Sequence, residues 1–187
     1  AWGSFSEFVN ANPYYPVTNE DGTIPRDLDV YKRANYADIT ATNPYYNAML
    51  PSENRSKILS VTNNTNLNWY IIDNLRWTAS MSLNTTNTDN MNFTDPAHTK
   101  YASSDYTKQG EYSSSKSRSW RYTMNTGIAY ALSLNDHNLT FNGRAEIRST
   151  SSNTESFVAT GFPKGVGAIP SFAYSFKENS TPGYSES

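Results

Sequence analysis

Carboxylates and histidines, the side chains most often used for acid–base or metal chemistry, are scattered along this sequence. The carboxylates considered as candidates are Glu53, Asp73, Asp95, Asp105, Glu111 and Glu146. Acid–base hydrolysis needs two such groups at a defined separation in space, and no motif of the sequence brings two of them together. We therefore expect no catalytic residue and no enzymatic activity.

The sequence also predicts no metal or cofactor site. His98 lies in a predicted loop and His137 in a predicted turn, and we interpret both as turn residues. The chain contains no Cys, which excludes a disulfide framework, a thiolate zinc site and a cysteine nucleophile. No nucleotide-binding, serine-hydrolase or zinc-protease motif is present, and no predicted helix follows the glycines of 165–167.

Two other sets of side chains could contact a solute. Charged residues on or beside the polar face of the predicted strands are Arg76, Arg121, Arg144, Glu146 and Arg148. We favour a role in solvating or bracing that face, and contact with a passing substrate is the alternative. Tyrosines in predicted loops are Tyr14, Tyr15, Tyr45, Tyr46, Tyr101, Tyr106 and Tyr112. They could stack on sugars, contact a lipoprotein or pack on one another, so no substrate-binding residue is assigned.

The elements that position these side chains are two predicted β-hairpins, 56–84 and 119–148. In both, apolar and polar side chains alternate with the period of a strand. The first hairpin turns at 72–74, and the second at 135–138, where Asn and Asp tolerate left-handed backbone. The apolar positions are Leu59, Val61, Leu67, Trp69, Ile71, Leu75, Trp77, Ala79, Met81, Leu83, Trp120, Tyr122, Met124, Ile128, Tyr130, Leu132, Leu134, Leu139, Phe141, Ala145 and Ile147.

The two faces of these hairpins differ sharply in chemistry. Over the alternating positions 59–71, 75–83, 120–134 and 139–147, no charged side chain occurs on the face that includes Leu67 and Trp77, where Asn63, Thr65, Thr126 and Gly143 interrupt the apolar residues. Over the same positions the opposite face holds no aliphatic side chain larger than Ala. A charge facing lipid near the bilayer midplane costs about 2–4 kcal/mol. The pattern therefore predicts hydrocarbon on one face and water on the other.

Bulk composition agrees with strands of this kind. The 187 residues have a net charge of −2, which gives no basic footprint for nucleic acid. The hydrophobic fraction is 36%, with 14 Tyr, as expected where only one face of each strand is apolar. No apolar run reaches the roughly 20 residues of a membrane-spanning helix. The first residues do not resemble a signal peptide, so we expect an internal or processed start.

Long irregular segments separate the predicted hairpins. We expect extracellular loop regions at 1–55, 85–118 and 149–187, alternating with the short turns. Outer-membrane barrels combine short periplasmic turns with long extracellular loops. Trp69, Trp77, Trp120 and Tyr122 lie near the ends of the apolar band, as in an interfacial aromatic girdle. The predicted fold is all-β, with about four long antiparallel strands forming part of a transmembrane β-barrel.

The order of landmarks resembles the SusC/RagA group of TonB-dependent outer-membrane transporters. The stretches that carry this resemblance are 12–16, 19–22, 43–45, 66–71, Gly110, 126–133, 137–139, 143–146 and 159–163. The resemblance implies a fragment of a larger barrel in the Gram-negative outer membrane, active in importing oligosaccharides or peptides. It further implies four partners: a SusD-like surface lipoprotein, TonB through a segment outside this chain, the remainder of the barrel, and membrane lipid.

Two other interpretations remain open at this point. A soluble, secreted β-sandwich that binds carbohydrate would show the same alternation, although its strands are usually about 5–6 residues long. A small complete barrel or an adhesin would need a closing strand after residue 148, and residues 149–187 show no convincing one. The sequence does not identify the substrate.

Overall fold

The computed structural model describes residues 14–33, 36–178 and 180–187 of the chain. Its secondary structure is predominantly antiparallel β-sheet, which confirms the predicted all-β class. Among these residues, no helix has the length and apolar character needed to traverse a bilayer.

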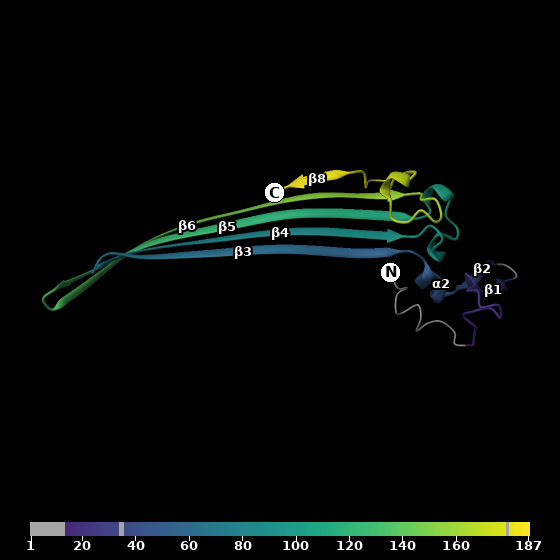
Figure 1. The fold of residues 1–187 in the computed structure, drawn as a ribbon, viewed down its shortest axis with the longest axis horizontal. Helices are drawn as coiled ribbons and strands as arrows, with labels where there is room; N and C mark the ends of the chain where they lie inside the picture. The colour runs from purple at the N-terminus through teal and green to yellow at the C-terminus, as the bar shows by residue number, and fades with distance from the viewer. Residues whose placement is uncertain (1–13, 34–35, 179) are drawn as a thin grey trace. The chain divides into compact units, whose positions relative to one another are not determined.

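Four long strands dominate the fold (Figure 1). They are β3 (Glu53–Ile72), β4 (Leu75–Thr94), β5 (Glu111–Leu134) and β6 (His137–Thr160), neighbours in the order β3-β4-β5-β6. Two-residue turns join β3 to β4 and β5 to β6, which confirms both predicted hairpins. At the second turn Asn135 adopts φ 52°, the left-handed backbone expected for that position.

The strands are longer than the sequence predicted. Residues 85–94 and 111–118, expected in a loop, belong to β4 and β5, and residues 149–160, also expected in a loop, belong to β6. These extensions consist mostly of Asn, Thr and Ser on both faces. Without contrast between the faces the hydrophobic alternation stops, whereas backbone pairing continues. The connection between β4 and β5 is therefore 95–110.

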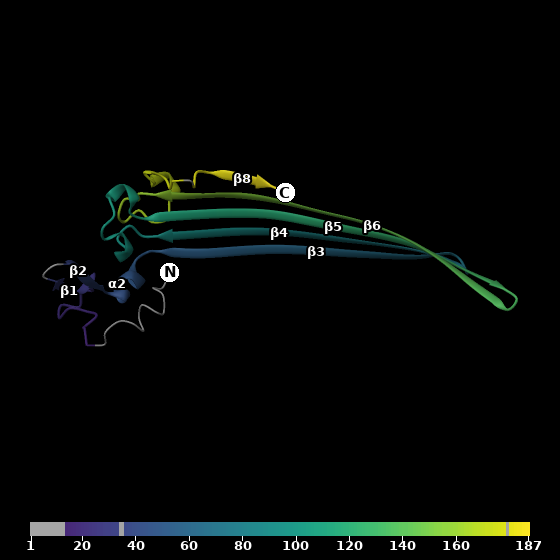
Figure 2. The same ribbon diagram turned by 180° about the vertical axis from the view of Figure 1, so that it is seen from behind.

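Residues 149–187 also contain two further strands. β7 (Ser175–Phe176) pairs with the end of β6, and β8 (Gly183–Glu186) pairs with β6 as well. Ser152 and Ser187 exchange two backbone hydrogen bonds of 2.7 and 2.8 Å. β8 runs beside β6 in both views of the ribbon (Figure 2). Residues 149–187, expected as a loop region, therefore contain strands, but neither of them closes the described sheet.

Residues 14–55, expected as loop, contain short elements. β1 (Asp27–Arg33) and β2 (Tyr36–Thr42) form a separate antiparallel sheet, and α2 (Pro44–Met49) follows. Asn43 begins the helix, since its side chain accepts a 3.0 Å hydrogen bond from the backbone N–H of Tyr45. Single-turn helices are η1 (Thr99–Tyr101), η2 (Tyr106–Lys108) and η3 (Pro170–Phe172). Residues 12 and 13 of the 12–16 landmark, with the rest of 1–13, lie outside the described part of the chain.

The chain divides into two compact units. The hairpin unit comprises 56–89, 115–155 and 184–187, and the loop unit comprises 1–55, 90–114 and 156–183. The core of the loop unit is a cluster of Met91, Phe93, Ala159 and Phe162, in which the two phenylalanine rings meet edge to face at 5.3 Å. This core joins segments that the sequence analysis had assigned to different loops.

Side-chain contacts in the hairpin unit confirm the predicted separation of faces. On the polar side, here the inward face, Ser82 donates to Asn64 at 2.7 Å and Asn84 donates to Thr62 at 2.7 Å. On the apolar side, here the outward face, the rings of Trp69 and Trp77 meet at 6.2 Å. For these residues, the face predicted by the alternation is the face on which their contacts occur.

Candidate functional site

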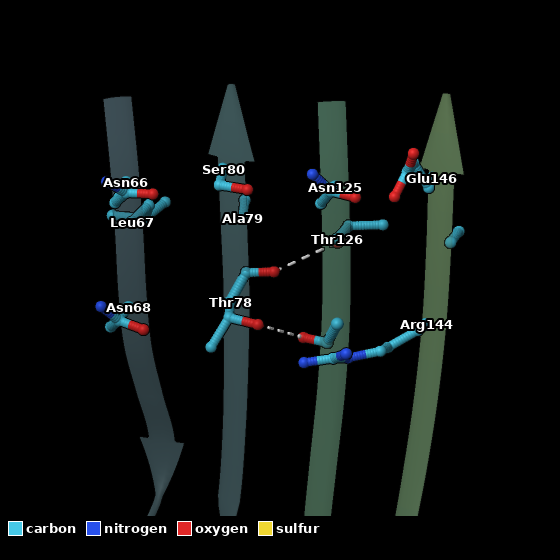
Figure 3. Close-up of a pocket in the computed structure, with 12 residues that line it drawn as sticks. Asn66, Leu67, Asn68, Thr78, Ala79, Ser80, Asn125, Thr126, Arg144 and Glu146 are labelled. Carbon is cyan, nitrogen blue, oxygen red and sulfur yellow. Dashed lines mark hydrogen bonds between the residues drawn. The ribbon is translucent and has the colours of Figure 1, made fainter. Parts of the chain in front are cut away.

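The inward face of the hairpin unit holds a polar hollow of about 590 Å³ (Figure 3). All four long strands contribute side chains to it. Those with an amide, hydroxyl or charged side chain on the inward face are Asn66, Asn68, Thr78, Ser80, Asn125, Arg144 and Glu146. Strands place these groups on one side because alternate residues face the same way, so the hollow follows directly from the period-two pattern of the sequence.

At Gly127, the lack of a side chain allows the Thr78 side chain of the neighbouring strand to lie close to the β5 backbone. A Cβ atom at Gly127 would lie 2.9 Å from the Thr78 hydroxyl and 3.7 Å from Cγ of Arg144. The Thr78 hydroxyl donates a 3.3 Å hydrogen bond to the Gly127 carbonyl, and the side chain of Arg144 extends toward β5 in Figure 3. The absent side chain of Gly127 therefore leaves room for the Thr78 hydroxyl, whereas Arg144 lies at ordinary van der Waals distance.

Hydroxyl and amide groups continue along the inward face. The hydroxyls of Ser60 and Thr86 lie 3.3 Å apart, and those of Ser117 and Thr154 lie 3.0 Å apart. Cross-strand contacts of this kind stabilise paired strands and present donors and acceptors to solvent. The inward face thus carries mainly neutral hydrogen-bonding groups, with a few charged side chains among them.

The structure brings the predicted charged residues together in part. Arg76 and Arg144 line a second, smaller inward hollow of about 270 Å³ beside the first. Glu146 pairs with Arg148 at 3.1 Å, whereas Arg121 donates a 3.3 Å hydrogen bond to Thr150. Pairing of Glu146 with Arg148 agrees with the bracing role favoured for these charges.

The candidate acid–base residues do not converge. Glu53 pairs with Arg55, and Glu111 pairs with Lys177. Asp95 is buried and accepts a 2.7 Å hydrogen bond from the backbone N–H of Ala97. Within the described ranges, no group of three or more His, Cys, Asp or Glu side chains could hold a metal ion.

The histidines and tyrosines occupy ordinary positions in loops and strands. His98 accepts a 3.1 Å hydrogen bond from the backbone N–H of Lys100 at the start of η1. Tyr112 stacks on Phe157 with a centroid separation of 5.8 Å, and Tyr101 is buried. Tyr14 and Tyr106 are the strongly exposed members of the set. The packing interpretation therefore fits Tyr101 and Tyr112.

Sequence analysis missed the residues that organise the loop unit. Asn47 donates a 2.7 Å hydrogen bond to the Thr99 hydroxyl and accepts a 3.1 Å bond from the Thr99 backbone N–H. Burial lowers the pKa of the neighbouring Lys100, whose ammonium lies 4.7 Å from the ring centre of Tyr101. Burial also raises the pKa of the Tyr101 phenol. No periodicity in the sequence relates residue 47 to residue 99.

Taken as chemistry, the inward face can solvate a polar solute and form reversible hydrogen bonds with it. Amides and hydroxyls both donate and accept, and Arg144 adds a cation suited to carboxylate groups. The described residues do not assemble a nucleophile with a base and an orienting partner, the arrangement that covalent catalysis requires. The arrangement can bind polar solutes through reversible hydrogen bonds.

Comparison with solved structures supports this fold. The chain is similar to a structure of the RagAB peptide importer in its closed-closed state, with a TM-score of 0.66 and 20% identity. The open-open state gives a TM-score of 0.64 and 19% identity, and in both cases all of this chain matches 20% of the other. A third structure, of the RagAB peptide transporter, gives a TM-score of 0.63 and 18% identity, with 93% of this chain and 18% of that chain matched.

The matched region is a minor part of those chains. This chain spans about one fifth of the length of the importer chains it matches. No protein-family model matches it, and no curated protein matches it. The likeness therefore establishes a shared arrangement of strands and no shared activity.

Proposed function

We propose that this chain forms part of the wall of an outer-membrane β-barrel that imports nutrients, with peptides or oligosaccharides as the substrate class. The observation that carries the proposal is the division of β3–β6 into an apolar outward face and a polar inward face. In a barrel of this kind the apolar face contacts lipid and the polar face lines the route of the solute. The chain itself performs no covalent chemistry.

Exposure of the outward face supports this proposal. Leu59, Trp69, Phe141 and Ile147 are each more than half exposed in the described part of the chain. A soluble β-sandwich would cover such a face with a second sheet, since large exposed apolar patches are rare on soluble monomers. The strands also have 20 and 24 residues, far longer than is usual in a sandwich.

Strand length also fits passage through a bilayer. A tilted strand needs roughly 9–11 residues to cross the hydrocarbon core. Those strands extend well past that length, and their apolar residues gather in the part nearer the two-residue turns. The remaining length would stand above the membrane, where the connections 95–110 and 161–174 would face the outside.

The similarity to RagAB peptide importer chains motivates the remaining parts of the proposal. A surface lipoprotein of the SusD kind would cover the extracellular mouth of the barrel. TonB would supply energy through a segment outside this chain, and the rest of the same barrel would pair with β3 and with the part of β6 that β7 and β8 leave unpaired. An unpaired strand edge in lipid costs several kcal/mol per unsatisfied group, so those edges require neighbours.

Single cysteines test the orientation of the two faces, because the chain contains no Cys of its own. Leu67→Cys and Met81→Cys report on the outward face, and their neighbours Asn66→Cys and Ser80→Cys are the matched inward controls. In the membrane-inserted protein, a water-soluble maleimide should label the inward pair and leave the outward pair unreacted. Efficient labelling of the outward pair in the native membrane would contradict the proposal.

A further inference from the structure

The apolar band of the outward face ends in a group of cations. On β3, Leu59 is followed on the same face by Lys57 at the next position toward the loops. On β5, Trp120 is followed in the same way by Arg118 and then Lys116. The change from hydrocarbon side chains to charge thus occurs within one step along each strand.

Contacts on the opposite face establish that these cations are outward. Ser60 contacts Thr86, and Ser117 contacts Thr154, and both pairs belong to the inward face. Successive strand residues point to opposite sides. Lys57, Lys116 and Arg118 therefore share the outward face with Leu59 and Trp120.

The three cations surround one hollow of about 480 Å³. Three consecutive residues from each of three adjacent strands line it, at 57–59, 87–89 and 116–118. Among these nine residues Asp89 is the one carboxylate, so the lining has a net charge of +2. Across the described ranges, none of these four charged side chains takes part in an ion pair within 4 Å. Their hydrogen-bonding capacity is available to a ligand.

The nearest additional carboxylate on this face does not neutralise the site. Glu155 shares the outward face of β6, since the alternation places it opposite Thr154. It does not line the hollow and forms no ion pair with Lys116 in the described residues. Glu186 of β8, which the pairing of Ser152 with Ser187 places on the same face, also lies outside the lining, whose own net charge stays +2.

Aromatic side chains mark the same boundary. The rings of Trp120 and Tyr122 stack at 5.6 Å with an interplanar angle of 15°. Rings of this type prefer the level of lipid headgroups, where one end is apolar and the other is wet. A ligand at this hollow would therefore meet hydrocarbon side chains on its lower side and cations on its upper side.

We propose that Lys57, Lys116 and Arg118 bind the phosphate-bearing headgroup of a membrane lipid on the outward face. This inference rests on the proposed function, since it requires the outward face to contact lipid. Guanidinium and ammonium groups both pair strongly with phosphate oxygens. A lipid also places its acyl chains against Leu59 and Trp120, which a free anion cannot do. The ligand class is an anionic phospholipid or phosphorylated glycolipid.

The test measures lipid retention by the full polypeptide purified in detergent and exchanged into phosphatidylcholine nanodiscs containing phosphatidylglycerol. Native mass spectrometry of the released protein counts the phosphatidylglycerol molecules that remain bound. A Lys57→Gln, Lys116→Gln, Arg118→Gln variant should lose enrichment by about fivefold per removed cation. Asp89→Asn should increase enrichment, and this gain would still be readable where the triple variant assembles poorly.

The matched control removes three cations from the inward face, as Arg121→Gln, Arg144→Gln and Arg148→Gln. This variant changes the net charge by the same amount and should retain the lipid. Equal loss of bound phosphatidylglycerol in both variants, or no loss in either, would contradict the proposed headgroup site. Full displacement of phosphatidylglycerol by inorganic phosphate would indicate a free-anion site and overturn the lipid assignment.

Failure of this inference can be distinguished from failure of the proposed function. If the cysteines introduced at outward positions 67 and 81 are protected in the membrane but the lipid stays unenriched, the headgroup site alone is wrong. If those cysteines react with the water-soluble maleimide, the outward face does not contact lipid, and both proposals are wrong.

Discussion

Trp77 places a hydrogen-bond donor on the outward face, which is mainly apolar. Its indole N–H donates a 2.8 Å bond to the hydroxyl of Thr126 on the adjacent strand. In lipid, no water replaces a lost partner, so polar groups must be satisfied within the protein. The Thr126 hydroxyl, which interrupts the apolar pattern of β5, thus has a physical reason to be there.

Thr126→Val should therefore destabilise the protein by about 1–3 kcal/mol, because it leaves the indole N–H without a partner. The double variant Trp77→Phe, Thr126→Val removes both groups and should recover most of this loss. Urea titration of the free energy of unfolding in lipid vesicles compares both variants with the parent protein. A cost near zero for Thr126→Val would indicate that water reaches Trp77.

Gly161 occupies a position that a side chain cannot. Its φ of +79° is left-handed, and an added Cβ would overlap the Thr107 carbonyl oxygen and lie 2.7 Å from Cβ of Tyr174. Gly165 has nearly the same φ, +80°, with no atom within 4 Å of an added Cβ. The two glycines therefore differ in packing and share their backbone requirement.

Gly161→Ala should destabilise the loop unit well beyond Gly165→Ala, the matched control. In the control, the loss of stability comes only from placing Ala in left-handed backbone, which costs roughly 1–2 kcal/mol. The additional loss in Gly161→Ala measures the overlap with Thr107. Limited proteolysis of the connections 95–110 and 161–174 is the readout, and equal sensitivity of both variants would contradict the structure.

At the scale of elements, α2 is linked to the β4–β5 connection by one side chain. Asn47 is 3% exposed, and its side chain makes two hydrogen bonds with Thr99, in η1. A six-residue helix is too short to be stable alone. Its position therefore depends on this contact and on its cap at Asn43.

Asn47→Ala should increase amide hydrogen exchange in both α2 and η1, because it removes two hydrogen bonds of about 1 kcal/mol each. Met49→Ala is the matched control on the same helix, since Met49 is largely exposed. Faster exchange in α2 with no change in η1 would show that the two elements are independent.

Sequence reasoning predicted the turns and the faces of these elements, and missed their ends. Alternation identifies a strand where one face is apolar, as between Leu59 and Leu83. It gives no signal where Asn and Thr occupy both faces, as in 84–88, although the backbone there pairs equally well. The core that joins Phe93 to Phe162 depends on pairing between distant strands, which local patterns do not encode.

The same limit applies to the candidate site. The sequence assigns Thr78, Gly127 and Arg144 to the polar face, but their proximity depends on the register between β4, β5 and β6. Register is a property of pairing between strands and cannot be derived from any one of them. The cations at Lys57 and Arg118 were missed because they lie outside the predicted hairpin or at its edge, beyond the apolar residues that defined it.

At the scale of the whole molecule, the proposed function requires neighbouring positions in a bilayer to respond differently to a charge. Leu67→Arg places a charge on the outward face near the middle of the apolar band and should cost about 2–4 kcal/mol. Asn66→Arg, one residue away, places it on the wetted inward face and should cost little. Folding into lipid vesicles followed by urea titration compares the two, and equal costs would remove the distinction between the faces.

Two-residue turns fix how β3 meets β4 and how β5 meets β6, since a slip of one residue would exchange the faces of a whole strand. The connections 95–110 and 161–174 are under no such constraint. Insertions there, away from packed positions such as Gly161, leave the faces of β3–β6 unchanged. Under the proposed function, related proteins could therefore change the substrate they recognise by changing these segments, while the strands that enter the membrane stay the same.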